Sequence, residues 1–378
     1  MNAREEYLKF LNDIFGEGTI QIDINDEWNN VTRTFCYKYD FCEFKQNFYN
    51  RLVRLRKVFE GTESYAALLN KVREVAFNKN WDGAYAELVA YDVLGSCGVK
   101  LELEKTLNAS DSFTQDLGGA KTNEDGLLAD YGIYFDVKRL GDTTRDILQS
   151  MVEGVKKDKS FGNRCHVHLE YQIDDDDDTY KSHLNDLRKE LLSSLTEGTE
   201  LINSHVIDGL RYHVTWDAGV SSAISTYDPY RHAENWKDLV FKRYTKKILK
   251  NNKFFLVFVN FPWYNTLIND FGGSNAILYR SLARRTFCGY MHSDVPMNSI
   301  LPQFMGTDTV FDVSKHISGM IFMEDNSINK DTYSCYTYLN PNAIHSVKET
   351  TAFDFLQHVV NGSENGTGIL DTLQYDNY

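Results

Sequence analysis

The sequence predicts an α/β protein in which helices flank a mixed β-sheet, with a mainly helical region at the N-terminus. Three observations support this prediction. Segments with apolar residues three or four positions apart occur along the same chain as segments that alternate at every second position. Two later segments, 254–261 and 318–323, are apolar on both faces, which is typical of strands in the centre of a sheet. With 378 residues, 42% of them hydrophobic, the chain can bury a substantial core.

The individual elements follow from the same patterns. Helices are predicted over residues 5–15, 44–60, 64–77, 81–98, 143–157, 174–195 and 236–253. The helix that begins at residue 81 is expected to stop at Gly95 or Gly98. Residues 19–41 have a more strand-like composition. Further strands are predicted over residues 99–105, 125–139 (as a hairpin), 165–173, 211–219, 254–261, 316–324 and 333–342.

These elements predict three parts. We expect a mainly helical region, an α/β domain that ends with additional sheet strands, and a loosely held tail, over residues 1–75, 76–361 and 362–378.

The charge and the cysteines restrict the class of protein. Lysine and arginine total 40, and aspartate and glutamate total 54, so the formal net charge is −14. This charge argues against a protein that coats nucleic acid, but it permits an enzyme with one basic groove. No window approaches eighteen uncharged apolar residues, so no membrane partner is expected. The six cysteines lack zinc spacing, and we expect reduced thiols in a cytoplasmic protein.

The hairpin segment DGLLADYGIYFDVKR, residues 125–139, carries charges where a sheet favours burial. Side chains alternate between the two faces of a strand. Asp136 and Lys138 therefore share one face, and Val137 points into the core on the other. The alternative is a solvated Asp136–Lys138 pair on an edge strand, which would add little stability.

The turn of this hairpin determines which residues face each other. A two- or four-residue turn centred on residues 130–131, with Gly132 in the left-handed conformation, places Asp125 directly opposite Asp136. Two carboxylates roughly 5 Å apart repel each other unless a cation lies between them. A hard divalent ion, Mg²⁺ or Mn²⁺, is the expected cofactor. A three-residue turn with a bulge would shift the pairing by one residue and separate the two acids.

Two further side chains extend this candidate site. Lys138 lies two residues after Asp136, where its ammonium can position and acidify a water that attacks a phosphodiester. Glu87 lies in the predicted helix 81–98, on its inward face or at the boundary, which is unusual for a carboxylate. It is the expected third acidic ligand.

A helical Glu, then Asp-x10-Asp-x-Lys across a hairpin, then a further helix, resembles the PD-(D/E)xK nuclease superfamily, shared by many restriction endonucleases and repair nucleases. The resemblance covers roughly residues 80–160 and implies a restriction-endonuclease-like fold. It implies that Glu87 is the helical acid and that Asp125 and Asp136 bind the metal. It also implies that the Val137 carbonyl is a further ligand and that Lys138 is the catalytic lysine.

The sequence departs from the family pattern at two positions. Glu124 precedes Asp125 where Pro is common, and Asp136 stands where Glu is commoner. Neither change removes the chemistry. Gln149 lies eleven residues after Lys138, where some family members use a glutamine to seat the lysine or the DNA. The alternative is an ordinary helical glutamine.

Basic residues in two later segments are candidates for contact with nucleic acid. The segment 236–253 is predicted to present one broad basic helical face, and 279–287 carries further arginines. A solvated surface is the alternative for both. The candidate residues are Lys242, Arg243, Lys246, Lys247, Arg284 and Arg285.

Together, these observations predict a Mg²⁺-dependent nuclease that hydrolyses DNA phosphodiester bonds by activated-water attack, most simply an endonuclease. The breadth of the family suggests a restriction or antiviral host-defence setting. Blunt cutting of both strands would need two active sites, hence a homodimer or a partner protein subunit, but nothing in the sequence identifies an interface. Two alternatives remain open: a non-catalytic nuclease-fold scaffold subunit of a larger complex, and an RNA-directed nuclease.

Overall fold

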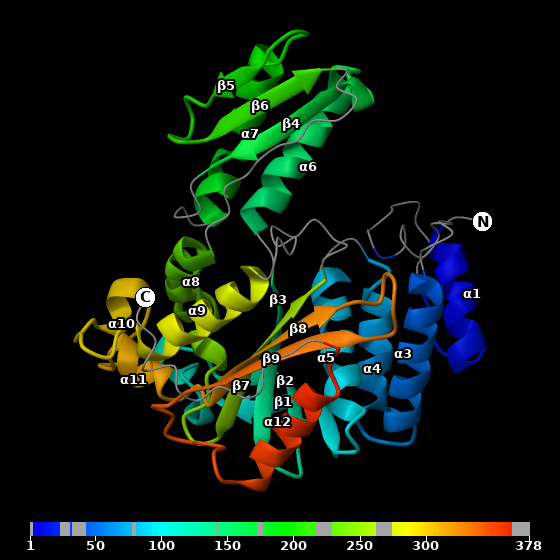
Figure 1. Cartoon of the computed structure of the whole chain (residues 1–378), viewed down its shortest axis with the longest axis vertical. Coiled ribbons are helices and arrows are strands. Elements are labelled where there is room, and N and C mark those ends of the chain that lie inside the picture. Colours follow the sequence, from blue (N-terminus) through cyan, green and yellow to red (C-terminus); the bar gives the residue numbers. More distant parts are fainter. Residues whose placement is uncertain are drawn as a thin grey trace. The chain divides into compact units, whose positions relative to one another are not determined.

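The computed structural model divides the chain into two compact units (Figure 1). Unit 1 comprises Met1–Leu140 and Trp236–Tyr378, and unit 2 comprises Gly141–Asn235. The structure describes residues 3–22, 31, 43–77, 81–140, 143–171, 177–216, 229–261 and 274–364.

Unit 1 is built on a mixed six-stranded sheet with the order β1-β2-β3-β7-β8-β9. Its strands are β1 (Leu101–Asn108), β2 (Lys121–Leu128), β3 (Ile133–Arg139), β7 (Lys253–Asn260), β8 (Gly319–Asp325) and β9 (Tyr333–Leu339). Strand β7 pairs in parallel with β3 and β8, and the other neighbours pair antiparallel. The two doubly apolar segments form the interior strands β7 and β8, as predicted. The α/β class with a mixed, helix-flanked sheet is confirmed.

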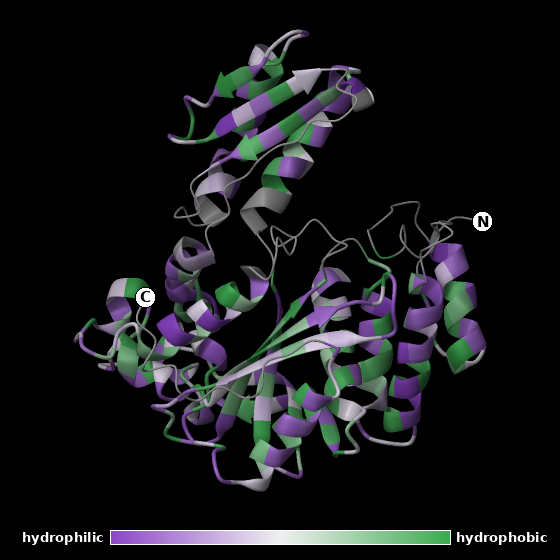
Figure 2. Ribbon diagram, viewed as in Figure 1, coloured by the Kyte–Doolittle hydropathy of each residue, from purple (hydrophilic) through white to green (hydrophobic). Residues whose placement is uncertain are grey.

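One face of this sheet packs against helices from both ends of the chain. These helices are α1 (Ala3–Phe15), α3 (Phe44–Phe59), α4 (Tyr65–Glu74), α5 (Trp81–Gly95) and α12 (Thr351–Asn361). Helix α5 is apolar on nearly every side and buried along most of its length, because it lies between the sheet and α3 and α4. It ends at Gly95, one of the two predicted positions. In Figure 2 the helices of unit 1 carry both hydrophobic and hydrophilic surfaces, as expected for helices that cover a core.

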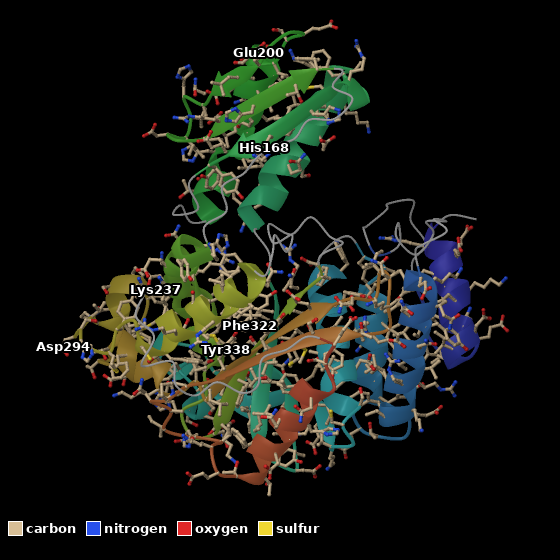
Figure 3. All side chains as sticks on the ribbon, viewed as in Figure 1. His168, Glu200, Lys237, Asp294, Phe322 and Tyr338 are labelled. Carbon is tan, nitrogen blue, oxygen red and sulfur yellow. The ribbon has the colours of Figure 1, made fainter. Side chains whose placement is uncertain are left out.

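On the opposite face, α9 (Ser274–Cys288) packs against β8 and β9, and Tyr244 at the end of α8 (Pro229–Tyr244) contacts Phe258 on β7. The short helices α10 (Met297–Ile300) and α11 (Val310–Ser314) follow along the chain. Aromatic rings fill this interface. Tyr279 on α9 stacks on Phe322 of β8, with ring centroids 4.6 Å apart. Phe322 also contacts Tyr338 on β9, edge to face at 5.9 Å (Figure 3).

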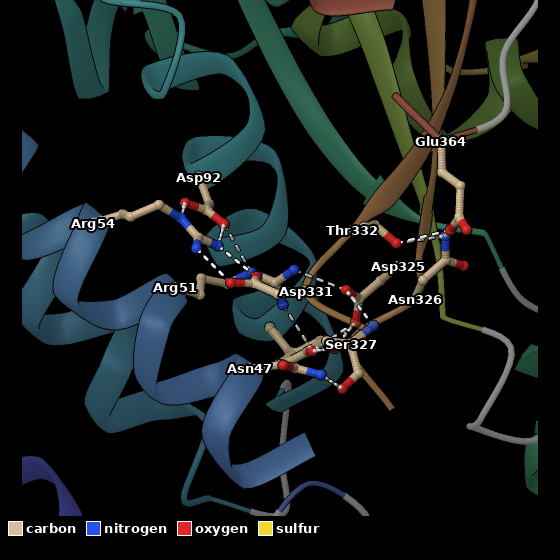
Figure 4. Close-up of polar contacts among 11 residues, drawn as sticks. Asn47, Arg51, Arg54, Asp92, Asp325, Asn326, Ser327, Asp331, Thr332 and Glu364 are labelled. Carbon is tan, nitrogen blue, oxygen red and sulfur yellow. Dashed lines mark hydrogen bonds and ion pairs between the residues drawn. The ribbon is translucent and has the colours of Figure 1, made fainter. Parts of the chain in front are cut away.

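A buried ionic network joins α3, α5 and the end of β8 (Figure 4). Arg51 on α3 contacts Asp92 at 3.2 Å, Asp325 at 2.8 Å and the Tyr85 hydroxyl at 3.0 Å. The Tyr85 and Ser327 hydroxyls each donate to the second oxygen of Asp325, both at 2.6 Å. The network thereby fixes the position of α5 against the sheet.

Unit 2 has its own sheet and core. Its elements are α6 (Thr143–Asp158), β4 (Cys165–Glu170), α7 (Asp177–Ser194), β5 (Leu201–Asn203) and β6 (Arg211–Trp216). The strands form a separate antiparallel sheet with the order β4-β6-β5. Side chains such as Val152, Leu187 and Tyr212 form a core within this unit.

The units differ from the predicted domains. The predicted boundary at residue 75 does not separate compact units, because the N-terminal helices share one hydrophobic core with the six-stranded sheet. The predicted domain 76–361 is divided by unit 2, which is inserted between β3 and β7. The strand-like segment 19–41 and the predicted tail lie largely outside the described residues. No described helix is long and apolar enough to cross a membrane.

Candidate active site

The β2–β3 hairpin has the predicted register. Gly126 pairs with Phe135, and the pairing continues to Leu128 and Ile133 at the turn. The turn has four residues and ends at Gly132, whose φ of 61° is the left-handed conformation expected there. This register places residues 125 and 136 at the next position along the two strands.

Strands β2 and β3 separate at that next position, and a side chain bridges the gap. The paired residues end at Gly126 and Phe135. Beyond them, the backbone N–H of Val137 donates to Oδ2 of Asp125 at 2.7 Å. Asp125 is therefore held against β3 by its own carboxylate. Asp125 lies near Asp136, since Nζ of Lys138 lies 4.0 Å from Oδ2 of Asp125 and 2.6 Å from Oδ2 of Asp136.

Asp136 lies at the centre of the site and is 0% exposed. Its Oδ2 is 2.6 Å from Nζ of Lys138, and its Oδ1 is 3.2 Å from Nζ of Lys247. Neither oxygen has a partner with hydrogen-bonding geometry among the described residues. Burial alone would raise the pKa of Asp136, but these two ammonium groups outweigh burial and hold it below its usual value.

The pKa values of Asp125 and Asp136 are shifted in opposite directions. Burial, followed by the charges of Asp136 and Glu87, raises the pKa of Asp125 well above its usual value. Without a cation, a proton on Asp125 relieves the repulsion between the two carboxylates. A divalent cation would do the same when this proton leaves.

Lys138 lies on the same face of β3 as Asp136, as predicted. Its Nζ is 4.0 Å from Oδ2 of Asp125 and lies over the ring of Tyr244, 5.4 Å from its centroid. Burial would lower the pKa of Lys138, but Asp136 and Asp125 together raise it. The side chain is thus a protonated ammonium that forms an ion pair with Asp136.

Glu87 is buried on α5, as predicted, but its carboxylate is already occupied. Nζ of Lys71 on α4 lies 3.1 Å from Oε1 and 3.0 Å from Oε2. The Tyr91 hydroxyl lies 2.8 Å from Oε2 and 3.1 Å from the Asp125 carbonyl. Glu87 therefore connects to the hairpin through Tyr91, at the backbone of Asp125.

Two residues complete the site without having been predicted to do so. Glu124 is 0% exposed and accepts a hydrogen bond from Thr122 at 2.9 Å through Oε1, while Oε2 has no partner among the described residues. Burial, then the charge of Asp136, raises the pKa of Glu124 to about 8. Lys247 contacts Asp136 and donates to the carbonyl of Asn123. It was predicted as a surface residue for nucleic acid, not as part of this cluster.

The remaining predicted basic residues are dispersed. Helix α8 ends at Tyr244, so Lys246 and Lys247 lie in the following 3₁₀ turn and share no helical face with the exposed Lys242 and half-buried Arg243. The single basic face predicted for residues 236–253 is therefore wrong.

The other predicted auxiliary residues are the arginines of α9 and Gln149. Arg285 on α9 is only 9% exposed and Arg284 is half-buried, so Arg285 presents little charge to a partner. Gln149 belongs to unit 2 and donates to Glu153 in its own helix at 3.2 Å, which agrees with the alternative of an ordinary helical glutamine.

The donor set fits a divalent cation chemically, although the lysines now occupy it. Carboxylate oxygens of Asp125, Asp136 and Glu124 and the Val137 carbonyl are the hard ligands that Mg²⁺ and Mn²⁺ prefer. Within the described parts of the chain, no three His, Cys, Asp or Glu side chains are arranged to hold a metal ion. Binding therefore requires the Lys138 and Lys247 ammonium groups to withdraw from Asp136.

Comparison of the chain with protein-family models, curated proteins and solved structures found no match.

Proposed function

We propose that this chain is a divalent-metal-dependent nuclease with a restriction-endonuclease-like fold, acting on DNA. The observation that supports it most directly is the hairpin register, which brings Asp125 beside Asp136 with Lys138 in contact. The order of elements adds support. Helix α5 precedes three antiparallel strands, and β7 then pairs in parallel with β3.

Each residue has a definite role in this proposal. Asp125, Asp136 and the Val137 carbonyl hold the cation, which would supply positive charge to the phosphate oxygens and a more acidic water. Lys138 stays protonated, so it donates hydrogen bonds to the attacking water or to a phosphate oxygen. Tyr91 and Glu87 fix the backbone at Asp125 from α5.

The test is cleavage of supercoiled plasmid, single-stranded DNA and RNA by the full chain in Mg²⁺, in Mn²⁺ and in EDTA. Cleavage of DNA is expected only with a divalent ion. Asp136→Asn and Lys138→Met should each lower the rate by about a hundredfold or more. Lys57→Met, at an exposed lysine on α3 far along the chain from the hairpin, is the matched control and should leave the rate unchanged.

Two outcomes would contradict the proposal. Wild-type cleavage by Lys138→Met would remove this mechanism, and cleavage that persists in EDTA would remove the metal. If RNA alone is cut, the RNA-directed alternative holds.

One observation favours a second candidate, a non-catalytic scaffold subunit. The ammonium groups of Lys71, Lys138 and Lys247 already neutralise the acids of the site without a metal. A scaffold of this kind should show no stoichiometric binding of Mn²⁺ by calorimetry and no cleavage of either polymer. The nuclease should show one or two sites per chain, lost in Asp136→Asn.

A further inference from the structure

We propose that Lys138 and Lys247 form a two-ammonium site that binds a backbone phosphate of the nucleic acid, with Lys247 as a second active-site lysine. This inference rests on the proposed function, because it takes the phosphate to be that of the nuclease substrate. It goes beyond that function by giving Lys247 a binding role, since the mechanism above assigns it none.

Lys247 is held beside the hairpin at both its side chain and its backbone. Its Nζ lies 3.2 Å from Oδ1 of Asp136 and donates to the Asn123 carbonyl on β2. The backbone just before it is fixed as well, because the Lys246 carbonyl accepts a hydrogen bond from the Thr122 hydroxyl at 3.3 Å. These contacts make Lys247 part of the hairpin site, although it is far from the hairpin along the chain.

The segment that carries Lys247 also positions Lys138. Tyr244 is the last residue of α8, and the centroid of its ring lies 5.4 Å from Nζ of Lys138. Lys247 follows in the next turn. The two ammonium groups contact different oxygens of Asp136, Lys138 at 2.6 Å from Oδ2 and Lys247 at 3.2 Å from Oδ1. Asp136 therefore holds two cations at one place.

This trio carries one positive charge more than Asp136 balances. Two ammonium groups contact a single carboxylate, whose pKa they hold below its usual value. The nearby carboxyls keep their protons to higher pH than usual, because burial raises the pKa of Glu124 to about 8 and that of Asp125 well above its ordinary value. They therefore offset less of the excess positive charge, and an anion is the ligand that the two-ammonium site favours.

The lysines, and not the carboxylate, reach the solvent. The Asp136 side chain is 0% exposed, whereas the side chains of Lys138 and Lys247 are 24% and 18% exposed. A phosphate that approaches the site therefore meets the ammonium groups first. Each ammonium has three donors, so it can contact a phosphate oxygen and still contact Asp136.

The test is fluorescence anisotropy of a short labelled DNA duplex with the full chain in EDTA, at several salt concentrations. Lys247→Met should lower the slope of log affinity against log salt by about 0.9, the change for one lost phosphate contact, and weaken binding roughly tenfold near about 0.1 M salt. Lys247→Arg keeps the charge and should keep the slope. Lys57→Met, at an exposed lysine on α3, is the matched control and should match the wild type.

Asp136→Asn tests the same site with the opposite sign. It removes the carboxylate that the two ammonium groups neutralise, so it should bind the duplex more tightly than the wild type in EDTA. Thermal unfolding by circular dichroism identifies variants that fail to fold. Should Lys247→Met prove unfolded, Asp136→Asn and Lys138→Met decide the question.

The outcomes separate this inference from the proposed function. If Lys247→Met keeps the wild-type slope, Lys247 only neutralises Asp136 and the inference is overturned. Weaker duplex binding by Asp136→Asn, or no duplex binding by the wild type in EDTA, overturns it too. In each of these cases, Mg²⁺-dependent cleavage by the wild type would leave the nuclease proposal standing. If the slope changes as expected but no divalent ion supports cleavage, the two-ammonium site stands and the nuclease proposal fails.

Discussion

The metal-free protein should lose stability as the pH rises, and Glu124→Gln should remove much of that loss. Glu124 has a pKa of about 8 in the folded protein, against an ordinary value of 4.5. Between these values the folded state binds more protons than the unfolded chain, so the free energy of unfolding falls with rising pH. Below about pH 4, Glu124 is protonated in both states and the fold keeps its full stability. As the pH rises through about 8, the fold loses stability, because the unfolded chain releases this proton more readily than the folded protein does.

The size of the effect follows from the two pKa values. A carboxyl group with these values destabilises the fold by ~1 kcal/mol at about pH 5 and by ~4 kcal/mol at about pH 8. The difference, roughly 3.5 kcal/mol, is large compared with a typical folding free energy of about 5–15 kcal/mol. Asp125 also has a raised pKa, but it is present in both proteins, so the difference between them reports Glu124.

The assay is urea denaturation in EDTA at several values between about pH 5 and pH 8, followed by far-ultraviolet circular dichroism. Wild type and Glu124→Gln should differ increasingly as the pH rises, with the variant the more stable of the two at high pH. Parallel curves would refute the reasoning, because they would mean that Glu124 titrates at the same pH in the folded and unfolded chains.

Two further substitutions test how the site is supported. Arg51→Met should destabilise unit 1 by about 3–5 kcal/mol, because it removes the Arg51 charge that balances the buried Asp325 carboxylate. A shift in urea midpoint worth less than about 1 kcal/mol would contradict this. Gly126→Ala should lower the free energy of unfolding by about 1–3 kcal/mol, because its Cβ would lie 2.2 Å from the Phe135 ring. It should also weaken Mn²⁺ binding, because the clash would displace the hairpin. Gly83→Ala in α5 is the matched control, because nothing lies within 4 Å of the added Cβ. It should raise the free energy of unfolding by about 0.5–1 kcal/mol. Equal effects of Gly126→Ala and Gly83→Ala would rule out the steric explanation.

The parts of the site that depend on local sequence could be predicted. Turn geometry fixes hairpin register, and Gly132 makes the four-residue turn possible, so the relation between Asp125 and Asp136 followed from a few neighbouring residues. The inward position of Glu87 followed from the apolar stripe of its own helix.

The parts that depend on distant residues could not be predicted. Lys71 reaches Glu87 from another helix, and no periodicity in the sequence indicates this contact. Glu124 was noted only as a departure from the family pattern, and no periodicity in the sequence indicates that its carboxylate is fully buried. Lys247 was assigned to a helical face because helical spacing continues beyond Tyr244, where α8 in fact ends.

The predicted domain boundaries differ from the observed units for a related reason. The strands at residues 165–173 and 211–219 have the alternation of any half-buried strand, which does not reveal the sheet to which a strand belongs. Only tertiary pairing assigns them to unit 2.

The insertion of unit 2 between two neighbouring strands also governs when the site can form during synthesis. The acids of the hairpin and Lys138 leave the ribosome well before Lys247 and β7, with Gly141–Asn235 translated in between. A nascent chain paused within unit 2 therefore has the carboxylates but lacks both the second ammonium and the parallel strand against which β3 pairs. In the nuclease proposed above, an incomplete chain would therefore carry the acids of the site without the strand that supports them.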